Sequence, residues 1–198
     1  MDLTRTLAVL AGLAWTIGVA AIGTQANTDP VGAHYDTINR YFTIALLLIL
    51  AFAIRVRPRL PGLGGVALLC TGVAWLAGNV LEFWAVLATD LHTQKTADRL
   101  GESEAWWGSS VGWMIFMVGF VTTLIAAVSL AASQRSVTAW ATVPLAVVGT
   151  AATALWAVSP LAAAAAGLGL GLWLIWVSTL ERAAGRLETP ASDRGFSG

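Results

Sequence analysis

The feature that most constrains this chain is the length of its stretches without acidic or basic side chains. Residues 7–22 and 137–180 contain none, and Glu82 is the single one in residues 62–89. A helix crosses a bilayer core about 30 Å thick with about 20 apolar residues. Charged residues form 11% of the chain, against roughly 25% in soluble domains, too few to cover a surface in water. The sequence therefore predicts an all-α, polytopic integral membrane protein.

Polar residues divide the apolar sequence into six segments, which predict a single domain of six transmembrane helices over residues 1–182. The predicted spans are residues 7–23, 38–54, 63–89, 106–132, 137–158 and 161–180. Residues 183–198 are polar and contain Pro190, so we expect them to form a short disordered cytoplasmic tail.

Two of these spans have special features. Pro144 lies within the fifth span and predicts a kink there, with Thr142 placed to hydrogen-bond a freed backbone group. The first span, preceded by Arg5, resembles a secretory signal peptide. No clean A-x-A cleavage site follows it, so we expect it to be retained as a helix.

The basic residues are unevenly divided between the two ends of the predicted bundle. Eight belong to one end: Arg5, Arg55, Arg57, Arg59, Arg135, Arg182, Arg186 and Arg194. Three belong to the other: Arg40, Lys95 and Arg99. Positively charged loops stay in the cytoplasm, so we expect a multi-pass protein of the cell membrane with both termini cytoplasmic. Abundant arginine beside one lysine is typical of a high-GC genome and indicates a prokaryotic source.

Small residues recur at helical spacing and predict close contact between helices. Such stripes let two helix backbones approach each other in a membrane. We expect the stripes to pack within the bundle, and the alternative is contact with a second copy or with another membrane protein. Because the net charge is zero, the chain has no overall electrostatic attraction to nucleic acid. We expect the lipid bilayer to be its partner. The stripes comprise Gly12, Thr16, Ala20 and Gly23, then Ser109, Gly112, Phe116, Gly119 and Thr123, and finally Gly167 and Gly171.

Glu82 is the most informative residue because it is an acid inside a predicted span. A carboxylate there costs at least ~2.5 kcal/mol, so it should face the bundle interior or a water-filled cavity. Thr71, Trp75 and Asn79 precede it at spacings of three or four residues and share its helix face. The sequence therefore predicts that this face of the third span is buried.

We expect an outward-facing ligand site around Glu82 that takes a small polar or cationic species. The residues expected to form it are Glu82, Asn79, Trp75, Arg40 and Ser109. The alternative is structural: Glu82 pairs with Arg40, or it hydrogen-bonds Ser109 or Ser110.

A metal site is a further hypothesis. His34 and His92 lie in predicted outer loops, near Asp36 and Asp90. Imidazole and carboxylate ligands can hold zinc with an open position for water. No HExxH or comparable spacing occurs, so we expect no cofactor, with zinc at these residues as the alternative.

The motifs of several enzyme classes are missing from the sequence. There is no GxSxG, no Walker loop and no GxGxxG after a strand, and no lysine within a span could hold retinal. We therefore expect a protein that binds or translocates its ligand without covalent catalysis. Two alternatives stay open: a non-catalytic accessory subunit of a larger membrane complex, and a metal-dependent membrane hydrolase.

Overall fold

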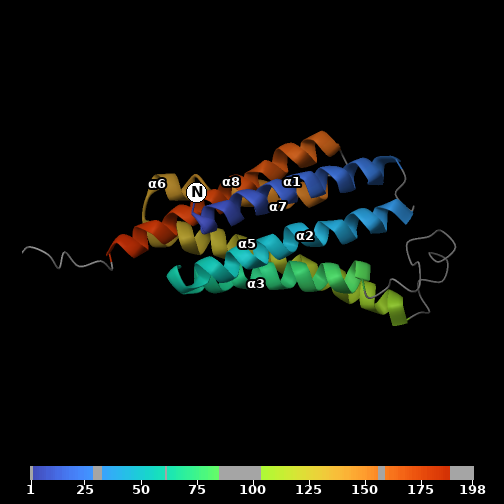
Figure 1. Cartoon of the computed structure of the whole chain (residues 1–198), viewed down its shortest axis with the longest axis horizontal. Helices are drawn as coiled ribbons and strands as arrows, with labels where there is room; N and C mark the ends of the chain where they lie inside the picture. The colour runs from blue at the N-terminus through green and yellow to red at the C-terminus, as the bar shows by residue number, and fades with distance from the viewer. Residues whose placement is uncertain (1, 29–32, 61, 85–103, 156–158, 188–198) are drawn as a thin grey trace, which may run out of the picture.

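The computed structural model describes residues 2–28, 33–60, 62–84, 104–155 and 159–187, and every element in them is helical (Figure 1). The elements are α1 (Leu3–Thr28), α2 (Ala33–Val56), the 3-10 helix η1 (Arg57–Arg59), α3 (Gly62–Asn79), the π-helix η2 (Val80–Trp84), α5 (Glu104–Gln134), α6 (Val137–Trp140), α7 (Val143–Leu155) and α8 (Pro160–Leu187). The predicted all-α class is thus confirmed for the described residues.

The helices form an elongated bundle in which neighbours in the chain are neighbours in space (Figure 1). α1 packs on α2, α2 on α3, α3 on α5, α5 on α7, α7 on α8, and α8 returns to α1. The least extensive of these contacts joins α5 to α7. The helices therefore form a closed ring, in which α1 and α8, the two helices farthest apart in the sequence, lie side by side.

Within the described residues, five helical segments are long and apolar enough to cross a membrane. They are Leu3–Thr24, Thr37–Arg59, Gly62–Trp84, Val111–Gln134 and Pro160–Leu180, with mean hydropathies between 1.6 and 2.3. They correspond to the first, second, third, fourth and sixth predicted spans. The third predicted span continues to residue 89, but residues 85–89 lie outside the described part of the chain.

The fifth predicted span is divided into two helices. α6 ends at Trp140 and α7 begins at Val143, so α7, with 13 residues, is about 20 Å long. Pro144 has no N–H for the carbonyl of Trp140, which interrupts the helical ladder. The Thr142 hydroxyl donates to the carbonyl of Ala139 over 2.7 Å, as expected of a residue beside a break.

The last helix is longer than the sequence indicates. α8 continues to Leu187, beyond the predicted end of the sixth span at Leu180, so the first residues of the expected tail are helical. Residues 188–198 lie outside the described residues, and disorder there stays a prediction.

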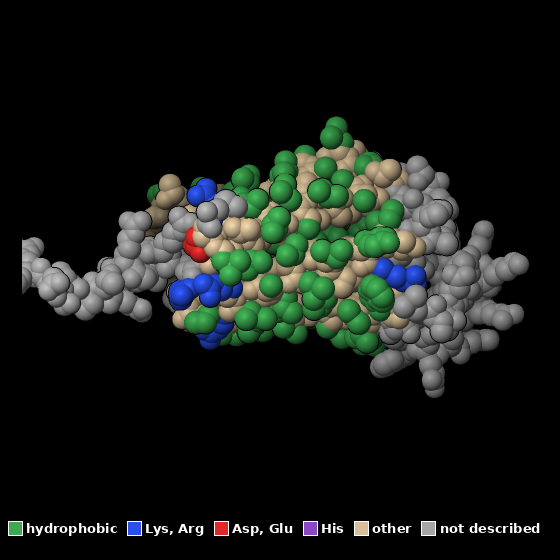
Figure 2. Space-filling model, in the orientation of Figure 1, with side chains coloured by type: hydrophobic (Ala, Val, Ile, Leu, Met, Phe, Trp, Pro, Cys, Tyr) green, Lys and Arg blue, Asp and Glu red, His purple; other side chains and the backbone are tan. Residues whose placement is uncertain are grey.

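On the face that Figure 2 shows, hydrophobic side chains cover the middle of the bundle, and basic side chains lie toward its ends. Large apolar side chains on this surface are well exposed, among them Ile17, Ile44, Val121 and Leu172. Exposed apolar surface of this extent is rare on soluble monomers, and it suits contact with lipid tails.

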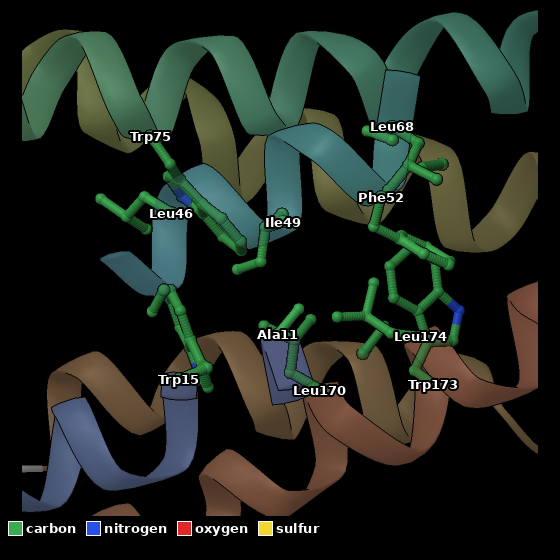
Figure 3. Close-up of a cluster of buried hydrophobic side chains, with 14 of the residues drawn as sticks. Ala11, Trp15, Leu46, Ile49, Phe52, Leu68, Trp75, Leu170, Trp173 and Leu174 are labelled. Atoms are coloured by element: carbon green, nitrogen blue, oxygen red, sulfur yellow. The ribbon is translucent and has the colours of Figure 1, made fainter. Parts of the chain in front are cut away.

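Two stacked tryptophans form the centre of the core (Figure 3). The ring centroids of Trp15 on α1 and Trp75 on α3 are 4.7 Å apart, and Phe42 on α2 lies 5.2 Å from Trp15. Trp15 Nε1 donates to the carbonyl oxygen of Gly149 on α7 over 3.1 Å. This one side chain therefore connects four helices of the ring.

The small-residue stripes pack inside the bundle. A Cβ atom added to Gly167 on α8 would lie 3.1 Å from Val19 and 3.2 Å from the backbone of Thr16, both on α1. On the opposite side of the ring, Gly112 of α5 faces Gly78 of α3. The glycines thus bring helices of the same chain together, and an oligomer or membrane-protein partner stays a prediction.

Candidate functional site

A pocket lies among the helices at the end of the bundle opposite the N-terminus. Its walls come from α1, α2, α3, η2, α5 and α7. The lining residues are Val19, Ile22, Asn39, Phe42, Gly78, Asn79, Glu82, Phe83, Trp113, Phe116 and Thr153. Apolar and aromatic side chains predominate, and four polar side chains, Asn39, Asn79, Glu82 and Thr153, lie among them. This combination is typical of small-molecule sites.

Glu82 reaches this pocket from a π-helix. α3 ends at Asn79, and η2 carries Glu82 at its centre. A π-turn is rare and occurs frequently at functional sites. A Cβ atom added to Gly112 would lie 2.7 Å from the backbone nitrogen of Glu82, so α5 approaches the π-turn closely because residue 112 is a glycine. The carboxylate oxygen Oε2 is buried, so water has little access to this atom.

Asn79 is held by hydrogen bonds to α2. Its Nδ2 donates to the carbonyl of Asn39 over 3.2 Å, and its Oδ1 accepts from the Thr43 hydroxyl over 2.7 Å. Trp84 Nε1 in turn donates to the same hydroxyl over 2.9 Å. The amide is 2% exposed, so these bonds fix its orientation at the pocket wall.

Arg40 supports the π-helix through its backbone. The guanidinium Nε donates to the carbonyl oxygen of Phe83 over 2.9 Å. A π-turn leaves α-helical carbonyls without their usual partners, so a charged donor from α2 stabilises the end of η2. Arg40 therefore contacts Phe83, the residue that follows Glu82.

Aromatic rings form much of the remaining wall. Trp113 and Phe116 on α5 stack with centroids 5.8 Å apart and an interplanar angle of 8°. Phe42 from α2 and Phe83 from η2 line the pocket from other directions. Trp113 is 50% exposed, whereas the three phenylalanines are buried. Trp113 therefore belongs both to the pocket wall and to the outer surface.

The structure brings some of the sequence-predicted site residues together. Glu82 and Asn79 line the pocket. Trp75 is fully buried in the core and Arg40 bonds the backbone of η2, and neither lines the pocket. Ser109 belongs to α5, but its side chain lies outside the described side chains.

Sequence reasoning did not identify Asn39 or the phenylalanines of the walls. Asn39 is 5% exposed. The feature of the sequence that could have identified it is a polar amide at the start of an apolar run, four residues before Thr43. Nothing in the sequence separates Phe42 and Phe116 from lipid-facing phenylalanines, because their place depends on packing between helices.

The proposed zinc ligands are only partly described. His34 and Asp36 belong to α2, but their side chains lie outside the described set, as do residues 90 and 92 entirely. Among the side chains that are described, no group of three metal-binding residues occurs. A zinc site at these positions stays a prediction.

The pocket has the size of a small ligand. Its cavity volume is about 60 Å³, and a single water needs roughly 10–15 Å³, so it holds roughly four to six waters or a ligand with a similar number of heavy atoms. Comparisons with protein-family models, with curated proteins and with solved structures found no match to this chain. Its function is therefore argued from the pocket itself.

Proposed function

We propose that this chain is a multi-pass protein of a prokaryotic cell membrane that binds or translocates a small polar or cationic species at Glu82. The six helical passages, with α6 and α7 sharing the fifth, would place both termini in the cytoplasm. The pocket would then open toward the outer side of the membrane.

The orientation is supported by the arginines of the described residues. Arg5, the cluster Arg55, Arg57 and Arg59, and Arg135 belong to the end of the bundle that holds the N-terminus and the end of α8 (Figure 1). Arg40 belongs to the opposite end, near the pocket. Loops rich in arginine remain on the cytoplasmic side, which favours an outward pocket.

The observation that carries the proposed activity is the carboxylate of Glu82 in a pocket between helices. An acid held at membrane depth is expensive and is usually functional. Here it lies on a π-turn beside two buried amides, and the cavity next to it has room for a small ligand. A carboxylate in such a place favours a cation or a hydrogen-bond donor.

A ligand screen on the full chain in lipid nanodiscs tests this function. Ammonium, methylammonium, guanidinium, sodium and urea would be compared for their effect on thermal unfolding. A ligand at 100 times its Kd stabilises the folded protein by about 2.7 kcal/mol. We expect at least one cation to stabilise the wild type, and we expect Glu82→Gln to abolish that effect.

Asp2→Asn is the matched control for this screen. It also replaces one carboxylate by an amide, but Asp2 is exposed at the other end of the bundle, and asparagine caps a helix as well as aspartate does. Its response to ligand should equal that of the wild type. Stabilisation that is the same in Glu82→Gln and wild type would contradict the proposed site, and uptake of the bound cation into proteoliposomes would separate transport from binding.

A further inference from the structure

We propose that the pocket selects a small alkylated ammonium ion, of which trimethylammonium is the simplest probe. This inference rests on the proposed function, and it adds the chemical class of the ligand. It concerns the aromatic walls of the pocket, which a site for an inorganic cation would not need.

The pocket combines one anionic side chain with a large aromatic surface. Glu82 supplies the anionic group, and Phe42, Phe83, Phe116 and Trp113 supply ring surface around the same cavity. Aromatic faces attract cations through the ring quadrupole, and tryptophan does so best. Rings that surround a desolvated cation are the usual means by which proteins recognise alkylated ammonium groups.

The pocket offers few polar side chains: besides Glu82 they are Asn39, Asn79 and Thr153, and the Thr153 hydroxyl already donates to the carbonyl of Thr150 over 2.9 Å. A bare sodium or potassium ion needs several oxygen ligands to replace its water. Asn79 already uses its carbonyl oxygen to accept from Thr43, so that oxygen is shared before any ligand arrives. Valine, isoleucine and phenylalanine cover most of the remaining wall. Methyl groups fit such a wall, whereas a hydrated ion would lose its water there without replacement.

Trimethylammonium also fits the cavity in size. A cavity of about 60 Å³ holds roughly four to six waters, which leaves room for the four heavy atoms of trimethylammonium. Its one N–H can donate to the Glu82 carboxylate, which makes a charge-assisted hydrogen bond. Its three methyl groups would then contact the rings.

Calorimetric titration of the full chain in nanodiscs tests the inference, with trimethylammonium chloride, ammonium chloride and tert-butanol as probes. We expect trimethylammonium to bind at least tenfold more tightly than ammonium, and the neutral alcohol of similar shape to bind no better than ammonium. Trp113→Leu should weaken trimethylammonium about fivefold and leave ammonium nearly unchanged. Trp113→Phe, which keeps a ring, should lie between the wild type and Trp113→Leu.

Trp140→Leu is the matched control, since Trp140 on α6 is also about half-exposed but does not line the pocket. It should bind trimethylammonium as the wild type does. Equal binding of ammonium and trimethylammonium, both lost in Glu82→Gln, would overturn this inference and leave the proposed function intact. Binding of tert-butanol as tight as that of trimethylammonium would also overturn it. Binding of neither cation would overturn this inference, and binding of either cation that is unchanged in Glu82→Gln would overturn both.

Discussion

A Cβ atom added to Gly171 would lie 3.1 Å from the Cα atom of Gly12, and one added to Gly12 would overlap with the Cα atom of Gly171. α1 and α8 are therefore in backbone contact at this point, and any side chain must push them apart. Such contacts are a main source of helix association in membranes, where lipid tails are as apolar as the helices.

Gly12→Leu should lower the free energy of unfolding by about 1–3 kcal/mol, the usual cost of overpacking a core. Unfolding in detergent, followed by circular dichroism, measures it. Ala51→Leu is the control, because Ala51 is exposed on α2 and a larger apolar side chain there meets only lipid or detergent. Equal stability of the two variants would contradict the close contact of α1 and α8.

Trp15→Phe should destabilise the protein more than Trp173→Phe. Both indoles are fully buried, so both variants remove about the same volume. Trp15 Nε1 donates to Gly149, whereas Trp173 Nε1 has no hydrogen-bond partner among the described residues. We expect a difference of about 1 kcal/mol in the free energy of unfolding, and equal losses would show that the bond to α7 contributes nothing.

Thr71→Val tests the hydroxyl cluster between α3 and α5. The Thr71 hydroxyl lies 2.9 Å from that of Thr122 and accepts from that of Thr123 over 3.3 Å. Valine has the same shape without the hydroxyl, so we expect a loss of about 1 kcal/mol in the free energy of unfolding. Thr179→Val is the comparison, since its hydroxyl is exposed and bonds only its own helix at Trp176. A similar loss at both positions would argue against the interhelical bonds.

Cysteine labelling of intact cells tests insertion and orientation. The native Cys70 is exposed on α3 in the middle of an apolar span, so a membrane-impermeant maleimide should leave it unlabelled in cells and label it after unfolding. In a Cys70→Ala background, Thr24→Cys at the outer end of α1 should react in intact cells. Gln134→Cys, at the end of α5 beside Arg135, should react only after the membrane is permeabilised. The reverse pattern would contradict the proposed orientation.

The sequence was sufficient for the long helices because length and apolar composition decide them locally. It also predicted a kink in the fifth span from Pro144, but not the division of that span into two helices. The break falls at Ala141 and Thr142, where the Thr142 hydroxyl bonds a carbonyl of α6. The position of such a helix boundary depends on side-chain geometry, which the spacing of apolar residues in the sequence does not specify.

The candidate site could be predicted only at positions where a polar residue interrupts an apolar span. Glu82 and Asn79 are polar groups inside an apolar span, and both line the pocket. The π-turn at Glu82 could not be foreseen, because no feature of the sequence distinguishes residues 80–84 from a continuing α-helix. The phenylalanines of the walls were equally hidden, since Phe42 and Phe116 line the same pocket as Glu82 only when α2, η2 and α5 are packed together.

The order of the ring has a consequence for biosynthesis. Under the proposed insertion, Glu82 enters the bilayer with the third helix, while the walls contributed by α5 and α7 are still being translated. At 5–20 residues per second, the interval between residues 84 and 155 lasts on the order of ten seconds. During it the nascent chain carries a carboxylate in an unfinished bundle, in which the partners of the bonds from α2 to Asn79 and Phe83 have already been translated.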